Sequence, residues 1–418
     1  MHPIIQKLCE DLRLRGFSDH TIRSYTSHVA DYLSTLSKPL TLTNELDVRA
    51  YQLLLMDVRH LSPPSYAQRK VMTALASCRT SALGAHKIVC EDCGHTEISY
   101  NSCRNRHCPK CQTFSKERWT DKQKASLLPV GYFHVVFTLP DLLNSVLFQN
   151  QEIAYNLMFK AVWDTLRELS ADKKYLGAEA GVTSILHTWG QQLVYHPHIH
   201  CIVSGGGITK SGKWLYSRKK FFLPMRVMAK LFRGKFLAYL RAEYNRLNFF
   251  GDSEYLNNPE SFHNLMQSCY SKDWIVYSKP PFKTVNTVVE YLGRYTHRVA
   301  ISNNRILSVK DSRVTFVWKD YRDNNKRKIM TITTEEFIRR FLLHVLPKGF
   351  NKIRHFGYLG SRSRSVKLSI CRAALSVRNT YIPKTTTELL ERMGVKPYCS
   401  CAVCGSEKLR HCFERMNN

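Results

Sequence analysis

The chain has 418 residues, of which 44% are hydrophobic, so it is long enough for several domains with cores of their own. No apolar run approaches the roughly 18 residues of a membrane span. The N-terminal stretch carries acidic residues and does not resemble a secretion signal, so we expect a cytoplasmic protein. Lys and Arg number 62 against 33 Asp and Glu, a net charge of +29. This excess favours nucleic acid as a partner and makes a membrane surface a poor candidate, and an enzyme that is basic for unrelated reasons is the alternative.

Residues 1–75 have the apolar spacing of a small helical bundle. Helices are predicted in IIQKLCEDLRLRGF, after an N-cap at Ser18, in NELDVRAYQLLLMDVRH and, past the break LSPPS, from Tyr66. The phrase FSDHTIRSYTSHVADYL resembles the helical core-binding domain of tyrosine recombinases, which grips DNA. The catalytic pattern of those recombinases is not visible downstream. We therefore expect a DNA-gripping domain, with a generic helical bundle as the alternative.

Residues 76–120 are expected to form a zinc-binding module. The chain has 14 cysteines, and their clustering in CxxC pairs without a secretion signal indicates metal binding rather than disulfides. Two such pairs, separated by fourteen residues, predict one tetrahedral zinc site. Cys103 and His107 are spare donors that could replace one ligand. The predicted zinc ligands are Cys90, Cys93, Cys108 and Cys111.

Polar side chains within the second CxxC pair and in the few residues before it lead us to expect that this module contacts DNA. These side chains are Arg104, Asn105, Arg106 and Lys110. A purely structural role for the module is compatible with the same pattern.

The last expected domain, residues 346–418, is basic and ends in a second group of donors. It contains only one clean CxxC pair, so a second zinc site there is left open. The donors are Cys399, Cys401, Cys404, His411 and Cys412.

Residues 121–345 mix strand and helix patterns and predict an α+β domain with an antiparallel sheet. In GYFHVVFTLP, apolar residues alternate as in a strand, and a long helix follows to about Ser170. A basic helix is expected from about Pro224 to Leu247, and EYLGRYTHR lies in another helix. The remaining predicted strands are VTSILHTWGQQLVY, HIHCIVS, WIVYS and RVTFVWKD, the first two joined by a short turn at a proline.

Two histidines in HPHIH predict a metal site in this domain. His198 and His200 are two apart on a strand and project from the same face, where they can chelate a divalent ion. A third ligand is expected from the partner strand, and we favour Gln191, with His187 as the alternative. An amide oxygen suits Mg²⁺ or Mn²⁺ better than zinc. A histidine that merely satisfies its own hydrogen bonds is the competing interpretation.

Two tyrosines, Tyr291 and Tyr295, stand four apart on a predicted helix and therefore lie one above the other. Such a pair is often only packing. A tyrosine hydroxyl, with a pKa of about 10, is a poor nucleophile at neutral pH. It can attack a phosphodiester when a metal polarises the phosphate, and the product is a phosphotyrosine linkage.

Five segments carry a resemblance to known proteins: FTLP at 137–140, YHPHIHCIVSGGG at 195–207, YLGRYTHRVAISNNRI at 291–306, SCRNRHCPKCQ at 102–112 and VLPKGFNKIRHFGYLG at 345–360. The first three stand in the order of the three motifs of HUH endonucleases, and all five together resemble the transposases of the IS91 family. The resemblance implies rolling-circle transposition in a bacterial cytoplasm, at the nucleoid, on single-stranded element ends and target DNA. It also implies that His198 and His200 bind the metal and that Tyr291 and Tyr295 are nucleophiles; Gln191 is not part of it.

Two alternatives remain at this point. A plasmid replication initiator or relaxase would use the same chemistry and differ in its biological substrate. A zinc-containing DNA-binding protein without catalysis would explain the charge and the cysteines, but not the paired histidines and tyrosines. The sequence does not indicate the DNA ends, the oligomeric state, the native metal or the order in which the tyrosines act.

Overall fold

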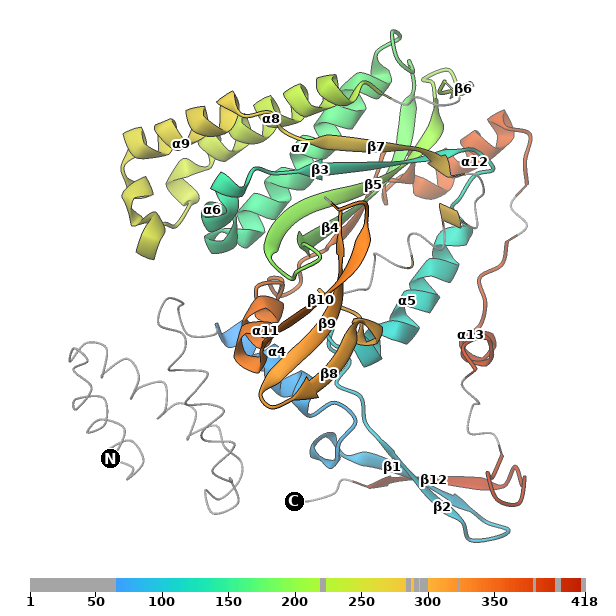
Figure 1. The fold of residues 1–418 in the computed structure, drawn as a ribbon. Helices are drawn as coiled ribbons and strands as arrows, with labels where there is room; N and C mark the ends of the chain where they lie inside the picture. The colour runs from blue at the N-terminus through green and yellow to red at the C-terminus, as the bar shows by residue number, and fades with distance from the viewer. Residues whose placement is uncertain are drawn as a thin grey trace, which may run out of the picture.

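Figure 1 presents the computed structural model, which describes most of the chain from Ser65 onward. Residues 1–64 lie outside the described part, so the recombinase-like bundle expected there stays a prediction. None of the helices described combines the length and the apolar character needed to cross a bilayer. Also outside the described part are residues 219–222, 283–286, 289–292, 294–299, 322, 379–380, 395–399 and 415–418.

The centre of the molecule is a six-stranded sheet in which every pair of neighbours is antiparallel, as expected for an α+β fold. Its order is β11-β4-β5-β3-β7, with β6 paired to β5. The strands predicted around FTLP, HIHCIVS and WIVYS are confirmed. The bounds are β3 (Tyr132–Thr138), β4 (Glu179–Trp189), β5 (Tyr195–Ile208), β6 (Trp214–Tyr216), β7 (Val276–Phe282) and β11 (Ile353–Phe356).

One face of this sheet is covered by helices and holds the main core (Figure 1). Phe133, Val135 and Phe137 project toward them because side chains alternate along β3. The predicted long helix and basic helix are confirmed as α7 and α8, which pack against each other and against the sheet. The helices of this layer are α6 (Asn144–Gln149), α7 (Gln151–Ala171), α8 (Met225–Ala242) and α9 (Pro259–Ser271), with 3₁₀ turns at Asp141–Leu143, Tyr244–Arg246 and Gly251–Asn257.

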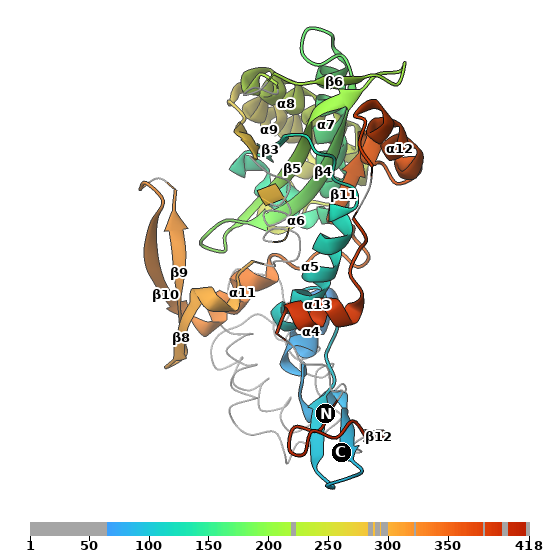
Figure 2. The same cartoon turned by 90° about the vertical axis from the view of Figure 1, so that its right-hand side faces the viewer.

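The opposite face has a smaller apolar cluster of Tyr132, Ile185, Ile202 and Val288. Beside it lies α5 (Pro109–Lys124), whose Trp119 packs against the cluster. In Figure 2, α5 leads from the sheet down toward the cysteine-bearing strands. This helix therefore links the central sheet to the cysteine-bearing module.

A second sheet, of order β10-β9-β8, stands apart from the first (Figure 2). Its inner face and α11 enclose a core that includes Phe316 and, from the turn between β4 and β5, Leu193. The second sheet thus packs against the turn of the hairpin formed by β4 and β5. The bounds are β8 (Ile306–Lys310), β9 (Arg313–Asp320), β10 (Lys326–Thr333) and α11 (Thr334–Leu342), after a 3₁₀ turn at Asn303–Arg305.

A third sheet, of order β12-β1-β2, joins segments from opposite ends of the described chain. The helix predicted from Tyr66 is confirmed as α4, which starts after a capping box at Ser65. The expected division at 75, 120 and 345 stays a prediction, but the region after 345 supplies strands to both the central and the third sheet. The bounds are α4 (Tyr66–Ala76), β1 (Ala85–Cys90), β2 (Thr96–Tyr100), α12 (Arg364–Ala374), α13 (Thr386–Arg392) and β12 (Leu409–Glu414), with 3₁₀ turns at Ser81–Leu83 and Gly357–Leu359.

Candidate active site

Three histidines converge on the face of the central sheet that the main core leaves free. His187 on β4 stands directly opposite His198 on β5, and His200 follows two residues later on the same face. One ring nitrogen from each of the three lies within 4.8 Å of the others. The predicted pair of histidines is therefore brought together, with a third imidazole beside it. This arrangement can hold a divalent ion on one side and leave its other positions open.

In two of these rings the Nδ1 atom has a hydrogen-bond partner. His198 Nδ1 lies 2.7 Å from the carbonyl oxygen of His196, which can only accept, so Nδ1 carries the proton. His200 Nδ1 lies 2.8 Å from Nε2 of His134 on β3, and the two rings stack. A partner on Nδ1 fixes the orientation of a ligand ring, as is usual around protein metal sites. His134 belongs to this site, and sequence reasoning missed it.

Burial keeps these imidazoles neutral. It lowers the pKa of His198 to about 4 and that of His134 to about 3. Burial, followed by the neighbouring His187, His198, His134 and Lys279, lowers the pKa of His200 well below its usual value. A neutral imidazole has a free lone pair for a cation, whereas a protonated one does not.

Gln191, our expected third ligand, lies beyond the end of β4, and its role as a ligand stays a prediction. β4 ends at Trp189 and β5 begins at Tyr195, so the turn comes earlier than the proline at which we expected it. Gln191 falls in the turn, where its Nε2 donates to Tyr321 Oη at 3.0 Å. The alternative, His187, is the residue whose ring nitrogen lies beside those of His198 and His200. Three nitrogen donors remove the argument from an amide oxygen and shift the preference from Mg²⁺ toward transition metals.

Tyr291 and Tyr295 lie outside the described residues. Val288 and Gly293, which lie near them in the sequence, are described. Val288 is fully buried against Ile185, which stands opposite His200 in the sheet. Gly293 packs so closely on α5 that an added Cβ would lie 3.3 Å from Thr120 Oγ1.

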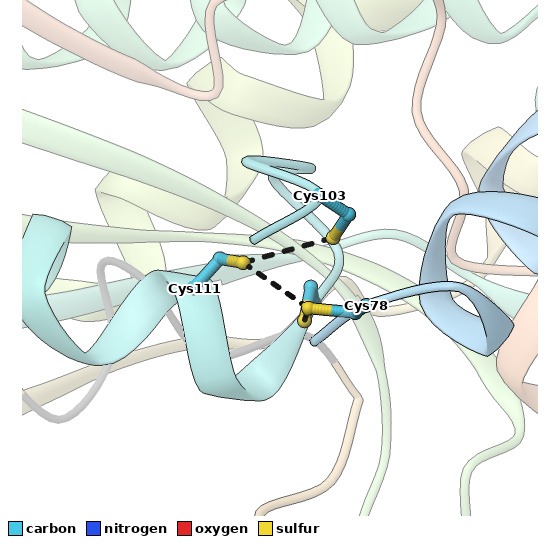
Figure 3. A group of neighbouring side chains, drawn as sticks. Cys78, Cys103 and Cys111 are labelled. Carbon is cyan, nitrogen blue, oxygen red and sulfur yellow. Dashed lines mark hydrogen bonds between the residues drawn. The ribbon is translucent and has the colours of Figure 1, made fainter. Parts of the chain in front are cut away.

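The structure does not bring the four predicted zinc ligands together, so this grouping is wrong. Cys108 and Cys111 lie instead with Cys78 and Cys103. Figure 3 shows three of the four, Cys78, Cys103 and Cys111. The Sγ atom of Cys111 is 3.6 Å from those of Cys78 and Cys103, and Cys108 Sγ is 3.6 Å from Cys78 Sγ. Four sulfurs around tetrahedral zinc, at about 2.3 Å from the ion, are about 3.8 Å apart. The group therefore has the spacing of a tetrathiolate zinc site.

The hairpin between the two CxxC pairs explains the different grouping. β1 runs from Ala85 to Cys90, and six extended residues span roughly 20 Å, so Cys90 and Cys93 sit at the far end from Cys78. They lie instead with Cys401 and Cys404. Among the other donors predicted in the tail, Cys399 and the side chains of His411 and Cys412 are outside the described part.

The polar side chains expected to touch DNA have different roles. Arg106 is half-buried and its Nη2 donates to the carbonyl of Phe350 at 2.7 Å, which ties the module to the central domain. Asn105 Oδ1 accepts from the backbone of His107, the other spare donor, which is not in the cysteine group. Arg104 and Lys110 are exposed. These two stay available to a polyanion.

Two transposase family models match this chain, one over the region of the histidines and one over the cysteine-bearing module. A family model described as "Putative transposase" matches residues 181–366, and one described as "Transposase zinc-binding domain" matches residues 51–139. The chain is 46% identical over 348 residues to "Putative transposase y4qJ" of Sinorhizobium fredii, covering 81% of this chain and 87% of that protein. No solved structure matches.

A second relative carries the name of an insertion sequence. The chain is 26% identical over 302 residues to "Transposase for insertion sequence element IS801" of Pseudomonas savastanoi pv. phaseolicola, covering 70% of each protein. The match to the zinc-binding model supports Zn²⁺ as a cofactor. The chain therefore belongs to the IS91 family of transposases, with an N-terminal zinc-binding module.

Proposed function

We propose that this transposase nicks and joins single-stranded DNA at the ends of its element through a 5′-phosphotyrosine intermediate, and so drives rolling-circle transposition. The observation that carries the proposal is the convergence of three imidazoles on the sheet face against which Val288 packs. A member of a transposase family acts on DNA, and the net charge of +29 suits that partner.

The proposed ion site uses His187, His198 and His200. A bound divalent ion, Mn²⁺ or Mg²⁺ by our prediction, would polarise the phosphate and stabilise the charge that develops on it. The hydrogen bonds at Nδ1 of His198 and Nδ1 of His200 would hold the two rings in position. These residues thus hold the scissile phosphate at a fixed point of the sheet.

The proposed nucleophiles are Tyr291 and Tyr295, which flank Gly293 in the sequence. The tyrosine Oη forms a bond to phosphorus, the bond from phosphorus to the 3′ oxygen breaks, and the proton lost by the hydroxyl is balanced by the one gained by the leaving 3′ oxygen. The new bond stores the energy for rejoining. A second tyrosine permits a second transfer while the first strand is still attached.

The zinc module is proposed to position this helix segment. Zinc held by Cys78, Cys103, Cys108 and Cys111 would fix the start of α5, because two of these ligands lie at its first residues. The same helix packs against Gly293 through Thr120. A closed tetrathiolate site supplies folding energy and no chemistry of its own.

The test is a covalent-adduct assay on the full chain. Labelled single-stranded element ends are incubated with the wild type, with Tyr291→Phe, with Tyr295→Phe and with the double variant, in Mn²⁺, in Mg²⁺ or in chelator. We expect an SDS-resistant protein–DNA band that needs the metal and is lost in the double variant. His196→Asn serves as the matched control, since this neighbouring histidine is outside the ligand group.

The same assay distinguishes the alternatives. Tight DNA binding without any covalent band, in either metal and with every element end, would overturn the proposal in favour of a non-catalytic DNA-binding protein. A band that survives in the double variant would reject the tyrosines as nucleophiles. Movement of a marked element to a new site separates a transposase of this mechanism from a replication initiator with the same chemistry.

A further inference from the structure

We propose that the chain binds a second structural zinc ion in a tetrathiolate clasp that joins its C-terminal tail to its N-terminal module. The clasp consists of Cys90, Cys93, Cys401 and Cys404. The last two lie outside the segment, 51–139, that matches the zinc-binding family model. The inference does not depend on the proposed nicking chemistry.

The sulfur positions fit zinc and not disulfides. Cys90 Sγ lies 3.5 Å from Cys404 Sγ, and Cys93 Sγ lies 3.6 Å from Cys401 Sγ. All four sulfurs are within 4.8 Å of one another. A disulfide would need about 2.0 Å between one pair, whereas tetrahedral zinc places four thiolates about 3.8 Å apart.

The two halves of the clasp have the same local geometry, although they come from opposite ends of the chain. The sequences are CEDCG at 90–94 and CAVCG at 401–405. In each, the carbonyl of the first cysteine accepts from the backbone N–H of the glycine at 2.9 Å, and that glycine has a φ of 71° in one and 74° in the other. In each, the first cysteine also donates its N–H to the residue after the glycine, at 2.9 Å to His95 and at 2.7 Å to Ser406.

This repeated turn presents two sulfurs to one side, and a left-handed φ favours glycine at its end. Two such turns facing each other are what a tetrathiolate zinc site requires. A pair of chance cysteines would share neither the glycine nor the backbone hydrogen bonds.

The tail is held beside the module by further contacts. β12 pairs with β1 in antiparallel register, so that Leu409 stands opposite Cys90. Asp92, between the first two ligands, accepts from Ser406 Oγ at 2.6 Å and pairs with Lys408 Nζ at 3.3 Å. The four cysteines are therefore placed by pairing on both sides of the clasp.

The two strands of this sheet whose side chains are fully described, β1 and β2, bury little apolar surface. Every described residue of β2 is exposed or half-buried, and β1 buries only Ala85, Ile88 and Cys90. Small units without a sufficient core need a metal or a covalent link. A zinc ion at the clasp would supply that folding energy.

The clasp would also fix the course of the tail across α5. Between the central sheet and the clasp, the backbone N–H of Lys384 donates to Asp121 Oδ2 at 2.7 Å, and Arg392 pairs with Glu117. Both acidic residues lie on α5, the helix that packs against Gly293. The clasp links positions 308 residues apart and so closes a long loop around this helix.

The test is metal analysis of the full chain. Mass spectrometry of the purified protein measures zinc per chain, and reconstitution with Co²⁺ measures the thiolate-to-cobalt charge-transfer band, to which the histidine site does not contribute. We expect this band to saturate at two equivalents. The Cys401→Ser, Cys404→Ser double variant should lose one zinc and about half of the band, and so should Cys103→Ser, Cys108→Ser at the other site.

Controls separate the clasp from general damage. Ser406→Ala removes a neighbouring hydrogen bond but no ligand, and Cys371→Ser changes a buried cysteine of α12, so both should keep two zinc ions. Unchanged zinc in the tail variant would overturn the proposal. Should that variant fail to fold, the wild type decides by itself: saturation at one thiolate-bound equivalent, or iron in place of zinc, rejects the second zinc site.

Discussion

The two faces of the central sheet carry opposite kinds of residue, although they alternate along the same strands. On β5, Ile199 and Cys201 project into the helix-covered core, whereas His198 and His200 project from the other face. On β3, Phe137 faces the core and His134 faces the histidines. Successive side chains of a strand point to opposite faces of the sheet. One strand can therefore contribute apolar residues to the core and histidines to the opposite face.

This difference means that stability and metal binding should be separable by substitution. Large apolar residues on the core face contribute free energy of folding through burial and packing. On the histidine face, the buried rings of His134 and His200 are hydrogen-bonded to each other, which offsets part of the cost of burying them. We therefore expect changes on one face to affect one property far more than the other.

The largest effect is expected for Phe137→Ala on the core face. Phe137 is fully buried and packs edge-on against Phe232 of α8 at 5.1 Å between ring centroids. Its truncation should lower the free energy of unfolding by about 3–5 kcal/mol. Chemical denaturation of metal-free protein measures this. Val136→Ala, on the histidine face of the same strand, should cost clearly less, and an equal loss would contradict the asymmetry of the two faces.

A smaller effect in free energy, but a decisive one for the site, is expected for His187→Ala. Removing one of three ligands should reduce adduct formation by about 100-fold or more while the melting temperature of metal-free protein changes little. Gln191→Ala is the matched comparison, because Gln191 was predicted as the ligand and instead bonds to Tyr321. It should retain activity within about twofold. Loss of metal binding in Gln191→Ala, with His187→Ala unaffected, would restore the original prediction.

The local part of this arrangement was predictable from the sequence. Alternation along GYFHVVFTLP puts Phe137 and His134 on opposite faces, and the spacing of His198 and His200 correctly places them together. The helix beginning at Tyr66 was also predictable, because Ser65 and Gln68 form a capping box. These features depend on neighbours within a few positions.

The errors concern which distant segments meet. The choice of third ligand depends on where the turn between β4 and β5 lies. In that turn Leu193 adopts a positive φ of 62°, a conformation that a leucine does not predict. The zinc grouping depends on a hairpin that separates Cys93 from Cys108, and on a tail strand that returns to β1. A CxxC pair indicates a half-site and does not specify its partner. The repeated CxxCG turns were the signal that could have paired Cys90 with Cys401.

His134→Phe tests the residue that sequence reasoning missed. The variant keeps a planar ring but removes the nitrogen that lies 2.8 Å from His200 Nδ1. Loss of such a partner typically weakens metal binding by about 10- to 100-fold. Titration calorimetry with Mn²⁺ measures the affinity. His134→Gln retains an acceptor and should recover part of it, whereas equal weakening in both variants would indicate packing rather than orientation of His200.

The smallest effect is expected from protonation of a single side chain on the histidine face, that of His355. His355 on β11 lies beside Thr183, and burial, followed by the charge of Arg364, lowers its pKa to about 4. The unfolded chain, with a pKa near 6.5, binds this proton more readily, so the stability is complete above pH 6.5 and decreases as the pH falls toward 4. At pH 5.5 the loss of stability should be about 1 kcal/mol for this side chain.

Urea denaturation of metal-free wild type and His355→Asn at pH 7.5 and 5.5 measures this loss. The variant should show a pH dependence smaller by about that amount, whereas Phe137→Ala should show the same pH dependence as the wild type. If Phe137→Ala also lost pH dependence, the two faces would be coupled, and the independence on which the comparison rests would be wrong.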